Sequence, residues 1–345
     1  MDTLTHALSG MLLARATAPV QPHSGQLPLR SRMLVGLLAG AFPDSDFVLQ
    51  LFGDAFIYLN HHRGVTHSLP LLPLWALLLS GLFVLLWRRR HAWQAFYGVA
   101  LLALGIHVAG DVITAFGTRI FAPFSDYRAA LPAIFIIDLW FTGIIVAGLL
   151  AAWLWRSRLA ARLGLTLLAA YVGVQVWHMQ AAGEIAQHWV QTQGVTAREV
   201  AALPQPLSPF HWKLLARDDG GYHRADLNLY RDAVPATPTD DAGFLARVTA
   251  LYRPAGDLQW DYRPLFGADV AEQALAREAW QAPVLAGMHR FAEYPALYRI
   301  DRKSAGVCVW FYDLRFELRN LRNPFIFGAC RADEQARWRL ERLTE

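Results

Sequence analysis

Residues 69–87 read LPLLPLWALLLSGLFVLLW, a stretch of 19 residues without a charged side chain. An α-helix of that length rises about 28 Å, which nearly matches the bilayer hydrocarbon core of about 30 Å. The stretch therefore predicts a membrane-spanning helix. The composition of the whole chain agrees, because 54% of its 345 residues are hydrophobic and only 17% are charged.

The remaining apolar segments extend this prediction to a bundle. Three of them are long enough to cross a membrane, at residues 93–113, 131–155 and 163–179. Two shorter ones come first, at residues 4–18 and 33–42, and the former would be only about 22 Å long as a helix. Residues 1–182 are therefore predicted to form a mainly α, polytopic membrane helical bundle of four clear spans plus two short N-terminal helices.

The composition changes after residue 182. Shorter runs of alternating apolar and polar residues, separated by turn residues, are typical of strands. We expect two hairpins and one helix, which occupy residues 211–217 with 224–231, residues 296–301 with 307–318, and residues 269–280. Residues 183–345 are therefore predicted to be a soluble α+β domain.

The two cysteines, Cys308 and Cys330, lie in this second region, far from the histidines discussed below. They lack CxxC spacing and are not expected to bind zinc. They can form a disulfide only if their domain faces an oxidising compartment.

Short clusters of basic residues beside the apolar segments predict the orientation of the chain. Under the positive-inside rule the cytoplasmic side carries Arg15, Arg30, Arg32, Arg88, Arg89, Arg90, Arg156, Arg158 and Arg162. The C-terminal domain then lies outside, which in a Gram-negative cell is the periplasm. The N-terminus lacks the basic region and cleavage site of a secretory signal, so we expect it to be retained. The chain has no nucleic-acid recognition motif, and we expect none as a partner.

Ionisable residues gather on the predicted outer side of the membrane. The stretch NHHRGVTHS at residues 60–68 directly precedes the first long span, and His107 and Asp111 end the next one. Residues four apart share one face of a helix, so this pair can hold one ion or two adjacent ions. Polar groups at membrane depth are costly, and their gathering indicates a functional site.

The full candidate set predicts a metal centre with ligands from four chain segments. Its members are His6, Asp44, Asp46, His62, His67, His107 and Asp111. Imidazole and carboxylate suit Zn²⁺, with Mn²⁺ or Fe²⁺ as alternatives, and the set can hold two or three ions. Of the adjacent His61 and His62 we favour His62, because the two side chains cannot point the same way.

Catalytic roles follow from the chemistry of such a centre. A metal lowers the pKa of bound water toward about 7 and so supplies hydroxide as a nucleophile. We assign Asp44, Asp46 and Arg63 as candidate catalytic residues. Arg63 or Arg119 can clamp an anionic group, since guanidinium matches phosphate geometry. Alternatively, Arg63 supports a ligand carboxylate from outside the metal shell.

Four motifs in order carry a resemblance to a known family. They are MDTLTHALSG at residues 1–10, FPDSD at 42–46, HRGVTHS at 62–68 and HVAGD at 107–111. Together they resemble the YdjM-type family of inner-membrane metal-dependent hydrolases over about residues 1–150. More distantly, their order is similar to that in the zinc-dependent phospholipase C family, an all-α fold with a trimetal site that cleaves phosphodiesters.

The resemblance implies metal ligation by His6, by Asp44 or Asp46, and by His67, His107 and Asp111. The zinc phospholipases have a further HxxxE pair that this sequence lacks. Asp138 is the nearby acid that can substitute, as a ligand or instead as a structural partner. The number of metal ions therefore stays open.

These observations together predict a membrane-bound metal-dependent hydrolase. Because the site lies near the outer membrane interface, we expect a lipid or lipid-linked substrate, cleaved at a phosphoester. One alternative is hydrolysis of an amide, as in the membrane ceramidases. Another is a metal-ion carrier or binding protein without turnover.

The topology is directly testable. A reporter fused after Glu345 should be active in the periplasm, because the arginine clusters place the opposite side in the cytoplasm. Reporter activity in the cytoplasm would overturn the predicted orientation.

Overall fold

A computed structural model describes residues 1–20, 25–51, 55–87, 90–239, 241–303, 306–319, 323, 325–333 and 335–343. Arg88 and Arg89 of the predicted basic clusters lie outside these residues. The chain divides into two compact units, Met1–Trp177 and His178–Glu345. The division falls inside one long helix, shortly before the predicted boundary at residue 182.

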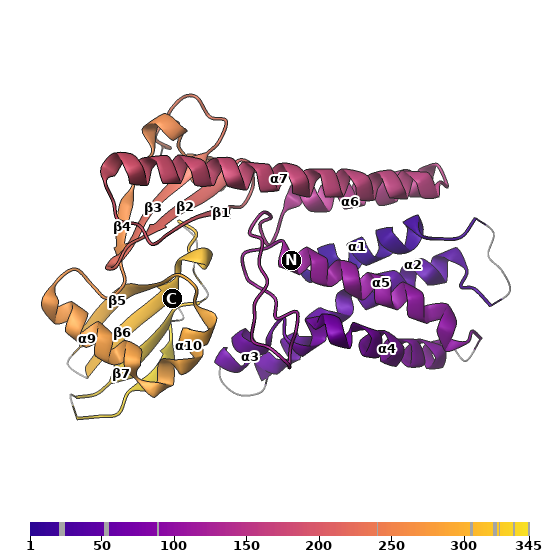
Figure 1. Cartoon of the computed structure of the whole chain (residues 1–345), viewed down its shortest axis with the longest axis horizontal. Coiled ribbons are helices and arrows are strands. Elements are labelled where there is room, and N and C mark those ends of the chain that lie inside the picture. Colours follow the sequence, from indigo (N-terminus) through magenta and orange to yellow (C-terminus); the bar gives the residue numbers. More distant parts are fainter. Residues whose placement is uncertain are drawn as a thin grey trace. The chain divides into compact units, whose positions relative to one another are not determined.

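The first unit is helical (Figure 1). Its α-helices are α1 Thr3–Ala16, α2 Leu29–Ala41, α3 Ala55–His61, α4 Leu72–Leu86, α5 Trp93–Val112, α6 Leu139–Leu154 and the start of α7 Arg158–Gln193. Short 3-10 segments join them, at η1 Phe42–Leu51, η2 Val65–His67 and η3 Leu69–Leu71.

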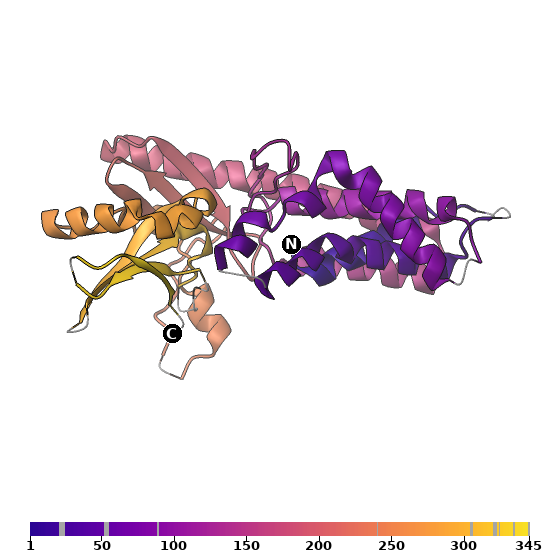
Figure 2. The same ribbon diagram turned by 90° about the horizontal axis from the view of Figure 1, so that it is seen from below.

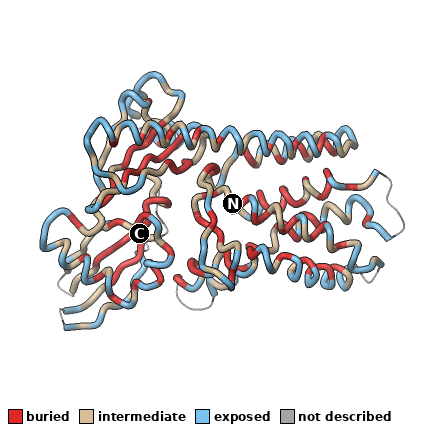
Figure 3. Tube along the Cα trace, in the orientation of Figure 1, coloured by how far each residue is buried: buried red, intermediate tan, exposed pale blue. Residues whose placement is uncertain are grey.

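Four helical segments in the described residues are long and apolar enough to cross a membrane: Leu29–Leu51, Leu69–Leu86, Trp93–Val112 and Arg158–Gln193. Only 28% of the apolar window of the second and 22% of that of the fourth is buried inside the protein. Figure 3 shows pale exposed positions along much of α7. Apolar surface of this extent requires an apolar surrounding, so the predicted membrane bundle is confirmed.

The predicted span at residues 131–155 was wrong at its N-terminal end. Helix α6 begins only at Leu139, because an Asp138 carboxylate oxygen accepts the backbone N–H groups of Trp140 and Phe141 at 2.9 and 2.8 Å. Residues 131–138, which contain Pro132, precede that cap and are not helical. The helix itself is therefore shorter than a full crossing.

Two other predicted lengths also differ. The short helix expected at residues 33–42 continues from α2 into η1, and the combined Leu29–Leu51 segment has 23 residues. The span expected at residues 163–179 is part of α7, which has 36 residues. That helix ends before Gly194, whose φ of 66° is a left-handed conformation that glycine adopts without strain. The change of composition near residue 182 does not end the helix.

Helix α1 lies at the centre of the first unit. On one side, Ala14 belongs to a core built from α2, α4 and α5, with Val35, Phe83 and Leu104 among its members. On the other side, Leu12 and Ala16 belong to a core shared with α6 and α7. A helix enclosed in this way does not need to span the membrane alone.

Glycines bring α1 and α2 into backbone contact. A Cβ atom at Gly36 would lie 2.5 Å from the Gly10 carbonyl oxygen, and one at Gly40 would lie 2.7 Å from the His6 carbonyl oxygen. Gly36 and Gly40 form a GxxxG spacing, which permits close helix approach in membranes. This approach fixes His6 on α1 beside the end of α2.

The second unit contains two antiparallel four-stranded sheets in the described residues, each with its strands in chain order. The first comprises β1 Glu199–Pro204, β2 His211–Arg217, β3 Gly221–Asn228 and β4 Asp261–Pro264; the second comprises β5 Pro295–Lys303, β6 Gly306–Asp313, β7 Phe327–Arg331 and β8 Arg339–Arg342. The helices are α8 Phe244–Thr249, α9 Val270–Gln281 and α10 Ala286–Phe291, with short 3-10 turns between elements. The predicted α+β character is confirmed.

Each sheet follows a helix in the chain (Figure 2). Ala182 and Ala186 of α7 share a core with Trp212 and Leu214 of the first sheet. Trp280 of α9 lies with its ring centroid 4.8 Å from that of Phe311 on the second sheet. The unit therefore repeats one pattern, a helix followed by a four-stranded meander.

Both predicted hairpins are present, as β2–β3 and β5–β6. The first turns earlier than expected, because Asp218 Oδ1 accepts the backbone N–H groups of Gly220 and Gly221 at 2.8 and 2.7 Å and closes a tight turn. Cys308 and Cys330 are directly opposed on β6 and β7 and form a disulfide.

We predict that Gly36→Ala destabilises the helical unit by about 1–3 kcal/mol, because the new methyl group overpacks the α1–α2 contact. Thermal unfolding in detergent, followed by circular dichroism, measures this. Gly105→Ala on α5 is the matched control, since a Cβ there meets nothing within 4 Å. Equal midpoints for both variants would contradict the close contact.

Candidate metal centre

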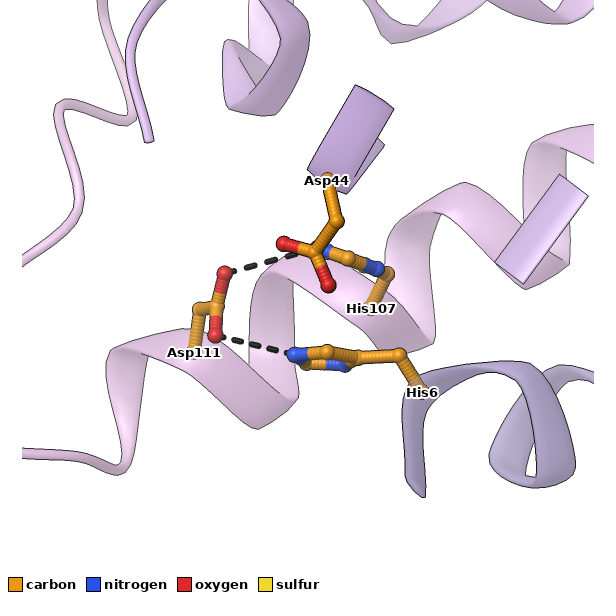
Figure 4. Close-up of side chains that lie close together, drawn as sticks. All are labelled: His6, Asp44, His107 and Asp111. Atoms are coloured by element: carbon orange, nitrogen blue, oxygen red, sulfur yellow. Dashed lines mark hydrogen bonds and ion pairs between the residues drawn. The ribbon is translucent and has the colours of Figure 1, made fainter. Parts of the chain in front are cut away.

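The last two turns of α5 present His107 and Asp111 toward the ends of α1 and α2 (Figure 4). Asp44, in the first turn of η1, reaches them directly from the end of α2, and His6 reaches them from the first turns of α1. His107 and Asp111 are fully buried, and His6 is 1% exposed. Helix ends that meet at one level of the bundle thus bring these four side chains together.

Four donor atoms are arranged like the ligands of a single ion: His67 Nε2, His107 Nε2, Asp44 Oδ1 and Asp111 Oδ2. His67 Nε2 lies 3.0 Å from His107 Nε2 and 3.1 Å from Asp111 Oδ2. His107 Nε2 lies 3.4 Å from Asp111 Oδ2, and Asp44 Oδ1 lies 3.7 and 3.8 Å from His107 and His67. Ligand atoms about 2.1 Å from a tetrahedral ion are about 3.4 Å apart, so the spacing fits such an ion.

His6 approaches the same centre from the other side of Asp111. Its Nε2 lies 3.0 Å from Asp111 Oδ1, and its ring stacks on that of His107 with centroids 3.6 Å apart. Ligand atoms of His6, Asp44, His107 and Asp111 also lie within 4.8 Å of one another. His6 is therefore a further donor at the edge of the four-atom set.

The tautomer of His107 follows from its outer contact. Its Nδ1 lies 2.6 Å from the carbonyl oxygen of Gly40, which can only accept a hydrogen bond. Nδ1 must therefore carry the proton, and Nε2 keeps a lone pair directed at the centre. Metal-binding histidines are commonly fixed by such an outer acceptor.

His67 is held by a second set of outer contacts. Its Nδ1 lies 2.9 Å from Thr66 Oγ1 and 3.8 Å from Asp46 Oδ2. Asp46 Oδ2 also accepts the backbone N–H of Arg63 at 3.1 Å, and Asp46 Oδ1 lies 2.8 Å from His62 Nδ1. Asp46 thus contacts His62, Arg63 and His67, and these contacts hold the segment that carries His67 in place.

The charge of Asp111 is balanced by cations. Arg63 Nη2 lies 2.9 Å from Asp111 Oδ1, and the amino group of Met1 contacts the same oxygen. Arg63 Nη1 also donates to Thr114 Oγ1 at 2.8 Å, and the guanidinium carbon of Arg63 lies 4.8 Å from the ring centroid of Phe116. Asp111 Oδ2, by contrast, is buried and lies 3.1 and 3.4 Å from the Nε2 atoms of His67 and His107. A buried carboxylate oxygen that faces two imidazole nitrogens at these distances has the surroundings of a metal ligand.

The structure separates the predicted residues into groups. His6, Asp44, His67, His107 and Asp111 converge, as described above. Asp46 and His62 contact each other behind His67, and the guanidinium of Arg63 is directed at Asp111. Arg119 pairs with Asp126 and donates to the Asn60 carbonyl oxygen at 3.3 Å.

Asp138 lies apart from these groups. Besides capping α6, its carboxylate accepts a hydrogen bond from Tyr171 Oη at 2.9 Å. These contacts correspond to the structural role that the sequence left open for it.

Two supporting groups were not predicted. No sequence pattern predicts that the Gly40 carbonyl oxygen contacts His107, because every residue has a carbonyl group. Only the GxxxG spacing of Gly36 and Gly40 marks this part of α2. Thr3 Oγ1, which donates to Asp44 Oδ2 at 2.8 Å, lies in the quoted N-terminal motif and adjoins the capped start of α1.

Comparison with known proteins agrees with the position of the centre. The model of the YdjM inner membrane protein family matches residues 1–182, which include every predicted ligand. The uncharacterized protein YfhP of Bacillus subtilis (strain 168) is 32% identical over 177 residues, which are 50% of this chain and 51% of that protein. The chain thus matches about half the length of this curated relative. No solved structure matches the chain.

We predict that Asp46→Asn lowers metal affinity roughly 10- to 100-fold, because it weakens the outer support of His67 without removing a ligand. Metal titration of the purified protein, with the bound ion quantified by mass spectrometry, measures this. Asp138→Asn is the matched control and should retain the parent affinity. If Asp46→Asn binds metal like the parent, the proposed support of His67 is wrong.

Proposed function

The chain belongs to the YdjM inner membrane protein family, and we propose that its helical unit is a metal-dependent hydrolase that acts on a lipid or lipid-linked substrate at a phosphoester bond. The observation that supports this most is the buried Asp111 Oδ2, which lies 3.1 and 3.4 Å from the Nε2 atoms of His67 and His107. Structural packing gives no reason to bury these three groups together in a membrane bundle.

The donor set favours zinc. Two imidazole nitrogens from His67 and His107, with carboxylate oxygens from Asp44 and Asp111, would hold one four-coordinate ion. Such an ion lowers the pKa of water toward about 7 and stabilises charge that develops on a phosphoryl oxygen. His6 lies at the other oxygen of Asp111 and is the donor available to an additional ion.

The surrounding residues have distinct roles in this proposal. Arg63 neutralises and orients Asp111, so it acts through the ligand rather than as the predicted clamp on substrate. Asp46 positions His67 from behind. Asp44 is 7% exposed, whereas His67, His107 and Asp111 are fully buried. We therefore assign the approach of water and substrate to the Asp44 side.

The predicted orientation of the chain supports an extracytoplasmic, lipid-linked substrate. The residues of the centre all lie at those ends of the apolar helices that the basic clusters place outside. The disulfide between Cys308 and Cys330 agrees with an oxidising compartment around the second unit, such as the periplasm. A substrate at this level of the membrane is a lipid headgroup or a lipid-linked group.

Complete burial of three donors also favours a second candidate function, a metal-ion carrier or binding protein without turnover. The same residues would then hold the ion, but no substrate would need to reach it. The two functions differ in whether the ion stays bound and whether a bond is cleaved.

We predict that the purified protein retains zinc and cleaves at least one member of a phospholipid panel. His107→Ala should lose both metal and turnover, with a loss of affinity above the roughly 10- to 100-fold expected for an outer contact. His61→Ala is the matched control, since its exposed side chain contacts only the Ile57 carbonyl among the described hydrogen bonds.

Other outcomes identify the alternatives. Cleavage of a ceramide but of no phosphoester would show that the enzyme hydrolyses an amide. Exchange of the metal and its transport into liposomes, without cleavage of any ester or amide, would exclude the enzyme and favour the carrier. Circular dichroism shows whether His107→Ala remains folded.

A further inference from the structure

The segment between α5 and α6 exposes aromatic side chains. Phe121, Phe124 and Tyr127 are 43%, 75% and 60% exposed. Phe121 and Tyr127 stack on each other, with centroids 6.4 Å apart, but none of the three belongs to a described core. Exposure of aromatic rings to water is unfavourable, so a surface that leaves three of them exposed is typical of a binding surface.

These rings are carried by an ordered segment. Thr118 and Ala129 form a two-way antiparallel bridge, with both N–H···O distances at 2.9 Å. The Arg119 N–H donates to the Arg63 carbonyl oxygen at 2.9 Å, and the Leu69 N–H donates to the Ile120 carbonyl oxygen at 2.8 Å. The segment is thus fixed across residues 63–69, which carry His67.

The exposed rings continue an apolar surface that already faces lipid. Leu69, hydrogen-bonded to Ile120, is 43% exposed at the start of the Leu69–Leu86 span. Farther along the same span, Leu74 and Leu78 are 49% and 54% exposed. The 119–128 segment therefore adjoins the exposed apolar surface of α4.

Two basic side chains converge beside the rings. Arg119 Nη1 and Arg128 Nη2 both donate to the Asn60 carbonyl oxygen, at 3.3 and 3.5 Å. Arg119, whose side chain is 18% exposed, also pairs with Asp126, whose side chain is 94% exposed. The geometry of a guanidinium group matches that of phosphate oxygens, so Arg119 and Arg128 together suit the phosphate layer of a membrane.

We propose that residues 119–128 form a lipid-docking loop, which lays Phe121, Phe124 and Tyr127 into the headgroup–acyl boundary and presents Arg119 and Arg128 to lipid phosphates. Aromatic side chains concentrate at this level of membranes. An irregular backbone is acceptable there, because water still reaches its polar groups. The loop brings the phospholipid surface to the edge of the segment that carries Arg63 and His67, and it does so whether or not the centre catalyses hydrolysis.

The depth of the loop can be measured in phospholipid nanodiscs. A nitroxide is attached to the full chain at Phe124→Cys, with the native disulfide left oxidised, and its collisions with oxygen and with a water-soluble nickel chelate are compared. Leu78→Cys on α4 is the lipid-facing control, and Val270→Cys, 83% exposed at the start of α9, is the aqueous control. A label at position 124 whose ratio of oxygen to nickel collisions lies between those at 78 and 270 supports docking at the headgroup–acyl boundary. A ratio equal to that at 270, in water, or to that at 78, in the middle of the span, overturns it.

The basic pair is tested in the same preparation. Arg119→Gln with Arg128→Gln should shift the label at 124 toward the aqueous control, because the phosphate contacts are lost. Arg156→Gln, at the opposite end of α6, is the matched control and should leave the depth unchanged. An unchanged depth in the double variant would overturn the role of the pair. Metal and turnover do not enter this measurement, so its failure is distinct from failure of the proposed hydrolase.

Discussion

The buried carboxylate of Asp111 is the constraint on which the helical unit depends. A fully buried charge in a membrane bundle is costly unless cations or a metal compensate it. The protein directs Arg63 and the Met1 amino group at one oxygen of Asp111 and two imidazoles at the other. Residues from η2, from α5 and from the start of the chain therefore contact the one carboxylate of Asp111, and the fold must bring them together.

The bundle meets this demand by enclosing a short helix. Helix α1 has 14 residues, too few to cross a bilayer alone, but it lies between two apolar cores. Its backbone contact with α2 at Gly36 and Gly40 aligns the ends that carry His6 and Asp44. At that end of α2 the Gly40 carbonyl oxygen accepts a hydrogen bond from His107 Nδ1. Helix packing and metal-site geometry are thus set by the same glycines.

The proposed lipid-docking loop and the candidate metal centre lie at one end of the unit. The 119–128 loop is bonded to residues 63–69, and these residues carry both Arg63 and His67. A lipid surface that covers the loop therefore lies beside the segment that supports the metal centre. This continuity gives a physical reason for a lipid-linked substrate, independent of the identity of the metal.

The sequence by itself determined the membrane bundle, the α+β region and the residue types of the centre, because hydropathy and motif spacing are local properties. The lengths of α6 and α7 were predicted wrongly, because a single residue sets one end of each helix: Asp138 caps the start of α6, and Gly194 follows the end of α7. Only the tertiary structure decided which donors lie close enough together to hold one ion. Asp44 and Asp46 are two residues apart, yet one faces His107 and the other supports His67 from behind. Their difference comes from the direction of each side chain in η1, which depends on the packing of α2 against α1 and α5 rather than on the local sequence.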